Sequence, residues 1–135
     1  MIRPGKAIVV DDSRAMRLLI GRALRNLGFT SFEAADGFEA LHLLEVEGDI
    51  SVMLVDWNMP TMSGLHLIRR VRDQKRWGEV PIMMVTSETD PDRVTEALEA
   101  GADEYLTKPF DSSMLSGKLE LMGFKIPRDQ TYVVI

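Results

Sequence analysis

The stretch Ser51-Val-Met-Leu-Val-Asp56-Trp-Asn-Met-Pro60 places an apolar, strand-like run directly before an acidic residue and a turn that ends in proline. A second apolar run, residues 7–10, leads in the same way into the pair Asp11-Asp12. Ligand sites in open α/β sheets gather at the carboxyl ends of neighbouring strands. We therefore expect the three carboxylates to lie together at one edge of a sheet, an arrangement that favours a bound cation.

Length and composition indicate one domain. The 135 residues are 45% hydrophobic, which is enough for one well-filled core but leaves no room for a second domain. Sixteen basic and twenty-one acidic residues give a net charge of −5, which disfavours nucleic acid and anionic membranes as partners. There is no cysteine, no signal-peptide core and no apolar run long enough for a bilayer, so we expect a cytoplasmic protein.

Strand-like runs alternate with stretches whose apolar residues recur at helical spacing, which predicts five βα units. Because the central runs are almost continuously apolar, we expect an α/β fold with a doubly wound, five-stranded parallel sheet covered by helices on both faces. The predicted strands are 7–10, 30–34, 52–55, 82–85 and 104–106, and the predicted helices are 13–27, 37–47, 64–77, 91–100 and 112–122.

Polar residues and glycines mark the helix ends. The expected N-caps are Ser13, Asp36, Asp90 and Asp111. Glycines that follow predicted helices are expected to adopt a left-handed conformation, and these are Gly28, Gly48, Gly78, Gly101 and Gly123. The arginines of the first helix are expected to form a solvated face, and these are Arg14, Arg17, Arg22 and Arg25.

The carboxylates suit Mg²⁺, which prefers oxygen ligands and keeps several waters, so two or three protein oxygens are sufficient. Two further polar residues, Thr86 and Lys108, follow strand-like runs and are expected at the same edge of the sheet. A lysine ammonium there can pair with a phosphoryl oxygen, and a threonine hydroxyl can hydrogen-bond to it. Taken singly, each residue has a simpler interpretation as a helix cap, a strand residue or a surface lysine.

The combination resembles the receiver domains of two-component response regulators, and the stretch from Asp56 to Pro60 is most similar to single-domain chemotaxis members of that family. The residues that carry the resemblance are Asp11-Asp12, Asp56 to Pro60 with Gly64, Thr86-Ser-Glu88, Tyr105 and Lys108-Pro109. It implies a flavodoxin-like strand order, 2-1-3-4-5, with five helices. Residues 1–122 would form the receiver domain, and 123–135 a tail of unknown role.

The resemblance implies that Asp56 accepts a phosphoryl group from a histidine kinase. Asp12, Asp56 and the backbone carbonyl of Asn58 would bind Mg²⁺, with Asp11 helping directly or through water. Lys108 and Thr86 would contact the phosphoryl group. The chain would thus be a signalling phosphoprotein that catalyses its own phosphoryl transfer and dephosphorylation, not an enzyme for a separate substrate.

The resemblance also implies an output. Thr86 would move toward the phosphoryl group, Tyr105 would turn inward, and a surface from about Pro91 to Met122 would bind a downstream protein. Asn58 and Glu88 are predicted to set the lifetime of the acyl phosphate because they flank the path of water. The expected partners are a histidine kinase and the downstream protein, with a phosphatase as a further candidate.

Several alternatives remain open. The chain could be a receiver domain cut from a multidomain regulator, or a Mg²⁺-dependent phosphohydrolase with an aspartyl nucleophile. The hydrolase lacks support because no second acid lies two residues after Asp56. A flavin mononucleotide carrier would need a phosphate-cradling loop where Asp11-Asp12 stand. The tail ends in Tyr-Val-Val-Ile, a β-prone run that could join a sheet edge, bind a partner, stay mobile or begin a linker.

Overall fold

Strands and helices alternate along the chain in this computed structural model, which describes residues 2–127 and 134–135. The strands are β1 (Lys6–Val10), β2 (Thr30–Ala34), β3 (Ile50–Val55), β4 (Ile82–Thr86) and β5 (Glu104–Thr107). The helices are α1 (Arg14–Asn26), α2 (Gly37–Glu47), α3 (Gly64–Asp73), α4 (Pro91–Ala100) and α5 (Ser112–Leu121), with a short 3-10 turn, η1 (Lys75–Trp77), after α3.

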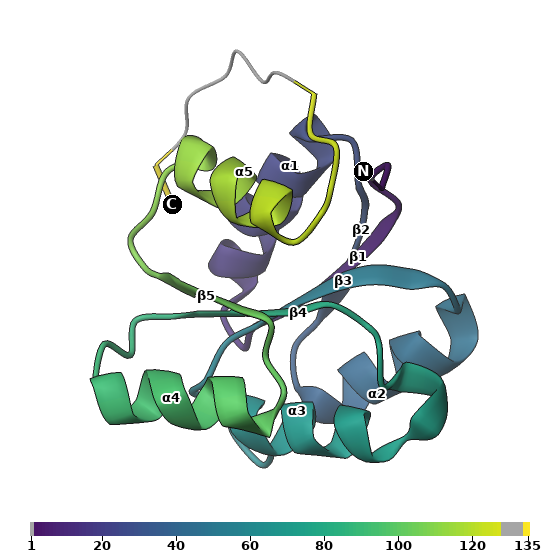
Figure 1. The fold of residues 1–135 in the computed structure, drawn as a ribbon, viewed down its shortest axis with the longest axis vertical. Coiled ribbons are helices and arrows are strands. Elements are labelled where there is room, and N and C mark those ends of the chain that lie inside the picture. Colours follow the sequence, from purple (N-terminus) through teal and green to yellow (C-terminus); the bar gives the residue numbers. More distant parts are fainter. Residues whose placement is uncertain (1, 128–133) are drawn as a thin grey trace.

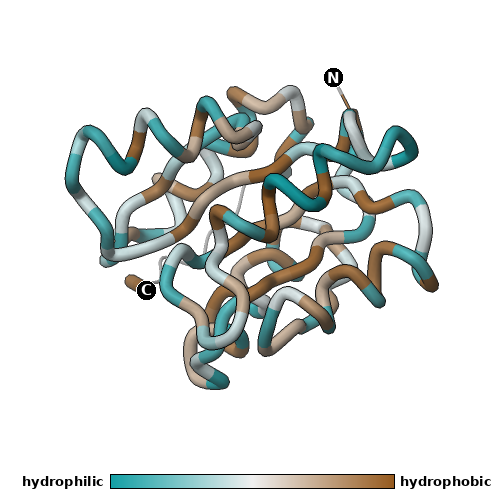
Figure 2. The backbone as a smooth tube through the Cα atoms, turned by 90° about the horizontal axis from the view of Figure 1, so that it is seen from below, coloured by the Kyte–Doolittle hydropathy of each residue, from teal (hydrophilic) through white to brown (hydrophobic). Residues whose placement is uncertain are grey.

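The strands form one parallel sheet in the order β2-β1-β3-β4-β5, which confirms the predicted doubly wound fold. Helices α1 and α5 cover one face, and α2, α3 and α4 cover the other (Figure 1). Apolar strands run through the middle, and the polar turns of the helices lie on the outside (Figure 2). Among the described residues, no helix is long and apolar enough to span a membrane.

The core has two halves because successive strand residues point to opposite faces of the sheet. Ile8 and Val10 of β1 belong to the cluster beneath α2, α3 and α4. Ala7 and Val9 belong to the cluster beneath α1 and α5. All four are almost completely buried. The sheet is therefore held from both sides, and its carboxyl edge is a firm support for the polar residues that follow the strands.

The predicted helix boundaries hold, with two corrections. The side chains of Ser13, Asp36, Asp90 and Asp111 all accept capping hydrogen bonds. The predicted helix 64–77 instead ends at Asp73 and continues as η1. Gly78 is right-handed, with φ −61°, so the expected left-handed cap is wrong there. Its N–H donates to the carbonyl of Lys75, which continues the turn. The other four glycines have positive φ, as predicted.

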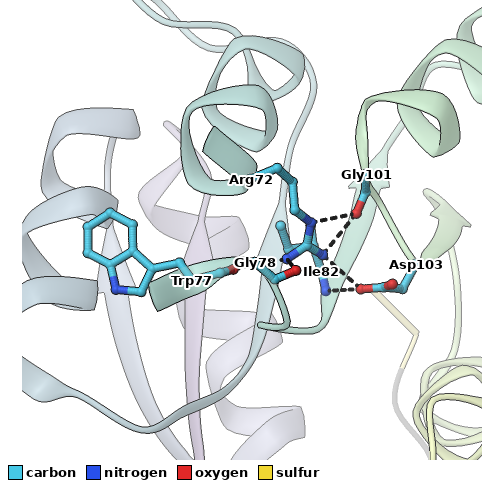
Figure 3. A network of polar contacts seen from close by, with 6 residues as sticks. All are labelled: Arg72, Trp77, Gly78, Ile82, Gly101 and Asp103. Carbon is cyan, nitrogen blue, oxygen red and sulfur yellow. Dashed lines mark hydrogen bonds and ion pairs between the residues drawn. The ribbon is translucent and has the colours of Figure 1, made fainter. Parts of the chain in front are cut away.

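Arg72, near the end of α3, forms hydrogen bonds with several segments at the amino edge of the sheet (Figure 3). Its side chain is 17% exposed. The guanidinium donates hydrogen bonds of 2.9 to 3.2 Å to the backbone oxygens of Gly101, Trp77 and Gly78 and to the carboxylate of Asp103. The same Asp103 oxygen accepts the N–H of Ile82 at 2.8 Å. Arg72 and Asp103 together therefore connect α3, η1, β4 and the loop before β5.

We expect Arg72→Met to lower the free energy of unfolding by about 2 to 4 kcal/mol, because it leaves several partly buried backbone oxygens without a donor. Arg69→Met is the matched control, since Arg69 is 58% exposed and its ion pair with Glu96 spans 4.0 Å. That control should change stability by less than about 0.5 kcal/mol. Chemical denaturation of both variants tests the expectation, and equal small effects would contradict it.

Candidate functional site

The three predicted carboxylates meet at the carboxyl edge of the sheet. Asp11 follows β1 and Asp56 follows β3, and the last residues of these adjacent strands, Val10 and Val55, are paired. Asp11 is 2% exposed and Asp56 is 9% exposed, whereas Asp12 is exposed. One carboxylate oxygen from each lies within 4.8 Å of the others. The strand ends thus bring the acids together as the sequence predicted.

The backbone holds the two buried acids in place. The N–H of Asp56 donates to the carbonyl of Val10 at 2.9 Å, which extends the sheet by one residue. A carboxylate oxygen of Asp11 accepts the N–H of Ser13 at 2.9 Å. The carbonyl of Asp11 accepts Arg17 Nη1 at 2.7 Å. Asp11 is therefore restrained through both its side chain and its main chain, and little freedom remains to be lost when a ligand binds.

Gly64 permits the close approach of α3 to the loop after Asp56. Its N–H donates to the carbonyl of Trp57 at 2.8 Å. A side chain at this position would collide with the backbone carbonyl of Asp56. The glycine in the family-like stretch is thus required by packing, and it lets the first turn of α3 support the loop that carries Asn58.

Lys108 lies between the two buried acids. Its Nζ is 2.7 Å from Asp11 Oδ2 and 3.8 Å from Asp56 Oδ2. The Lys108 side chain is 16% exposed, and its backbone N–H donates to the carbonyl of Thr86 at 2.9 Å. The peptide bond to Pro109 is cis. The ammonium is therefore closer to Asp11 than to Asp56.

Burial raises the pKa of Asp56 above its ordinary value. The charge of Lys108 opposes this rise, as do hydrogen bonds from the Thr86 side chain and the Asn58 backbone, while the negative charge of Asp11 adds to it. Desolvation of the carboxylate outweighs the help of its neighbours. An additional cation near Asp56 would therefore stabilise the ionised form that a nucleophile needs.

The donor set fits Mg²⁺. Carboxylate oxygens are its preferred protein ligands, and an exposed acid beside two buried ones leaves room for water. Asp11, Asp12 and Asp56 are the side chains that could hold the ion. Asn58 is exposed in the loop directly after Asp56, at the same edge of the sheet.

Thr86 and Tyr105 are linked through Glu88. The buried Thr86 hydroxyl accepts the N–H of Glu88 at 3.4 Å, and the Tyr105 hydroxyl donates to the carbonyl of Glu88 at 2.7 Å. Tyr105 is 8% exposed, so its ring already lies inward, whereas the resemblance led us to expect an inward turn only after phosphoryl transfer. The Glu88 carbonyl supplies the partner that makes this position favourable. Burial, with the charges of Glu88 and Asp56, raises the pKa of Tyr105.

Sequence reasoning missed Arg17. It was expected on a solvated face, but its side chain is 13% exposed and bonds to the Asp11 carbonyl as well as to Glu33. Helical side chains lean toward the amino end, so an arginine one turn after the N-cap Ser13 can reach back to the loop. The position of Arg17, one turn after the N-cap, was the signal in the sequence that could have predicted this contact. The other three arginines of this group are exposed, as predicted.

A second missed contact involves Trp57. This side chain is 4% exposed, and the guanidinium of Arg93 from α4 lies 5.2 Å from the centre of its ring. The residue next to Asp56 thus connects the acidic site with α4. Nothing in the spacing of the two residues predicts this contact, because they lie on different elements.

Known proteins are similar to this chain in fold and in sequence. Residues 7–120 match the family described as the response regulator receiver domain. The chain is 43% identical over 118 residues to chemotaxis protein CheY1 of Helicobacter pylori, covering 87% of this chain and 95% of that protein. It is 45% identical over 116 residues to a chemotaxis protein CheY homolog of Campylobacter jejuni, covering 85% and 89%. The solved structure of Vibrio cholerae CheY4 has a TM-score of 0.82 and 35% identity, covering 87% and 98%.

We expect Asp56→Asn to stabilise the protein at neutral pH in buffer without divalent ions. A raised pKa means that the folded protein binds the Asp56 proton more tightly than the unfolded chain does, so the ionised group destabilises the fold. This loss of stability appears as the pH rises through the titration range of Asp56, and it is absent below about pH 4. Denaturation of both proteins across this range should show the advantage of the variant disappearing in acid.

Glu79→Gln, at an exposed carboxylate before β4, is the control and should show no such pH-dependent difference. If Asp56→Asn is no more stable than wild type at neutral pH, burial is not the dominant influence on this carboxyl group.

Proposed function

The chain belongs to the response regulator receiver family, and on this premise we propose that Asp56 takes a phosphoryl group from a histidine kinase in the presence of Mg²⁺. The resulting acyl phosphate switches a protein-binding surface. The observation that carries the proposal is the position of Lys108, whose partly buried ammonium lies 3.8 Å from Asp56 at the edge where the other acids gather. A carboxylate with an adjacent cation is the arrangement that phosphoryl transfer requires.

In the transfer step, an oxygen of Asp56 attacks the phosphorus of a phosphohistidine. The bond between phosphorus and the imidazole nitrogen breaks, and its electron pair returns to that nitrogen. A bound Mg²⁺ would supply positive charge for the phosphoryl oxygens. Asp11 and Asp12, with the carbonyl of Asn58, are the remaining protein groups proposed to hold it.

Lys108 stabilises the product by changing partners. In the structure its ammonium is engaged mainly by Asp11, at 2.7 Å. A phosphoryl group on Asp56 adds negative oxygens within reach of a flexible lysine, and hydrogen bonds between ionised groups are the stronger kind. The lysine then offsets the charge on Asp56, while the Thr86 hydroxyl supplies a second hydrogen bond to the same group.

Glu88 carries the change from Thr86 to Tyr105. Its N–H is bonded to the Thr86 hydroxyl and its carbonyl to the Tyr105 hydroxyl. If Thr86 turns toward the phosphoryl group it releases the Glu88 N–H, and the loop before α4 can shift. Within α4, which the structure describes in full, Ala97 alone is buried, so few contacts oppose its movement. The proposed output surface is therefore the region from Pro91 to Met122.

Chemotaxis is the signalling pathway that we propose for the chain, because the relatives reported above are described as chemotaxis proteins. The partners would be a histidine kinase and a downstream protein, and a phosphatase could shorten the signal. A cytoplasmic location is part of this proposal, because the ATP that feeds such a kinase is an intracellular metabolite.

A small phosphodonor with Mg²⁺ should add one phosphoryl group, detectable by intact mass as an acid-stable, base-labile adduct. Asp56→Asn should abolish the adduct, because an amide is not a nucleophile of this kind, and chelation of Mg²⁺ should do the same. Asp49→Asn is the matched control, since Asp49 is an exposed acid at the opposite edge of the sheet and should leave labelling intact. Labelling of Asp56→Asn at the wild-type level would overturn the proposal.

Substitution of Asn58 or Glu88 by leucine should lengthen the lifetime of the acyl phosphate by about tenfold, because an apolar side chain no longer orients the attacking water. The decay of the labelled protein after removal of the donor measures this. Thr89→Leu, at an exposed neighbouring position, is the control and should leave the decay rate unchanged. Wild-type decay in both leucine variants would refute the role given to these residues.

A further inference from the structure

The described end of the tail pairs with the loop between β5 and α5. The N–H of Ile135 donates to the carbonyl of Phe110 at 2.7 Å, and the N–H of Phe110 donates to the carbonyl of Ile135 at 3.0 Å. Val134 lies opposite Asp111 in an antiparallel bridge. Figure 1 shows the C-terminal residues beside this loop. Residues about 25 positions apart thus form one hydrogen-bonded pair of the kind found between antiparallel strands.

The two tail residues differ in how deeply they are buried. Ile135 is 9% exposed and belongs to the core cluster beneath α1 and α5, together with Phe110 and Leu115. Val134 is 65% exposed. The contact therefore consists of a main-chain pair and one aliphatic side chain that reaches the core. Burial of such a side chain favours the contact, whereas the cost of ordering the chain opposes it.

Apolar surface remains open beside the contact. A shallow hollow of about 160 Å³ is lined by Pro109, Phe110, Asp111, Met114 and Val134. The Met114 side chain is 49% exposed there, and methionine adapts to ligands of different shape. Main-chain pairing with an apolar anchor is the mode by which proteins bind extended peptides at a strand edge.

We propose that residues 110–111 with Met114 form a strand-addition site for extended aliphatic peptides, and that Val134–Ile135 occupies it as an intramolecular ligand. The backbone of Phe110 supplies the specificity for an extended strand, and the core beneath it supplies the specificity for an aliphatic side chain. The β-prone run Tyr-Val-Val-Ile at the end of the chain pairs with this loop through its last two residues. Its first two residues lie outside the described part of the chain.

The inference rests on the proposed function in one respect. This strip, residues 110–111 with Met114, lies inside the surface from Pro91 to Met122 assigned to the downstream protein, so Val134 and Ile135 cover part of that surface. A tethered segment competes at an effective concentration on the order of millimolar. A partner that offers an extended aliphatic segment must displace the tail, and the tail thereby sets a threshold for binding.

Amide hydrogen exchange followed by NMR tests whether the tail occupies the strip. The full-length protein without phosphodonor should protect the Phe110 amide, and Ile135→Asp should speed its exchange by about tenfold or more. Val134→Thr is the matched control, because Val134 is mostly exposed, and it should retain protection. Leu54, in the central strand, reports on the global fold in each protein. If Ile135→Asp also loses protection at Leu54, the milder Ile135→Ala gives the decisive comparison.

A labelled peptide with the sequence of residues 131–135, amidated so that no terminal charge contributes, tests recognition. It should shift the NMR signals of Phe110 and Met114 in full-length Ile135→Asp at millimolar concentration or below. Wild type should bind it at least about tenfold more weakly, because its own tail competes. A control peptide with aspartate in place of the last isoleucine should not bind.

The tail site and the proposed function are tested by different measurements. Equal Phe110 exchange in wild type and the folded Ile135 variants, or no shifts at millimolar peptide, overturns the tail site. Neither measurement involves Asp56, so phosphoryl labelling remains an independent test of the proposed function. Ile135→Asp should accept the phosphoryl group as wild type does, because Ile135 bonds to Phe110 and packs in the apolar cluster beneath α1 and α5, to which Asp11, Asp12 and Asp56 do not belong.

Discussion

The organisation of the carboxyl edge depends on one partly buried cation. Lys108 lies within 2.7 Å of Asp11 and 3.8 Å of Asp56, and both acids are nearly inaccessible to water. Removing one partner of a buried ion pair costs about 3 to 5 kcal/mol, because the remaining charge is left uncompensated. Burial raises the pKa of Asp56 even with the ammonium of Lys108 nearby, so a single lysine does not fully offset the cost of burying this carboxylate.

Such a cluster can persist because the sheet beneath it is rigid. Val10 and Val55 are paired in adjacent central strands, and both are buried against the helices on one face. At the opposite edge, Arg72 joins α3, η1 and the loop before β5 through backbone oxygens. The unfavourable free energy of burying charged groups at the carboxyl edge is therefore offset by hydrophobic packing along the strands and by hydrogen bonds at the amino edge.

Most of the fold and the acidic site could be predicted from local sequence. Strand-like runs that end in acids, N-caps such as Ser13 and the family-like stretch around Asp56 all carry their signal within a few residues. The break after Asp73 was missed because the helical periodicity continues through η1, and Gly78 was misassigned with it. Arg72 and Arg17 were missed for another reason: most of the contacts of Arg72, and the contact of Arg17 with the acidic site, are to backbone carbonyls, which every residue has. The inward Tyr105 depends likewise on the carbonyl of Glu88.

The distribution of packing explains where a conformational change can arise. The central strands and α3 are buried deeply, whereas α4 is anchored through Ala97 and through Arg93 above the ring of Trp57. A charge added at Asp56 cannot deform the sheet, because that would open a well-packed core. It can alter the hydrogen bonds of Glu88 and the contact at Trp57, both of which link the site to α4. The α-helix with the fewest buried residues, α4, is thus the one in contact with Trp57, the residue beside Asp56, and a change in charge at Asp56 would act on the surface through this helix.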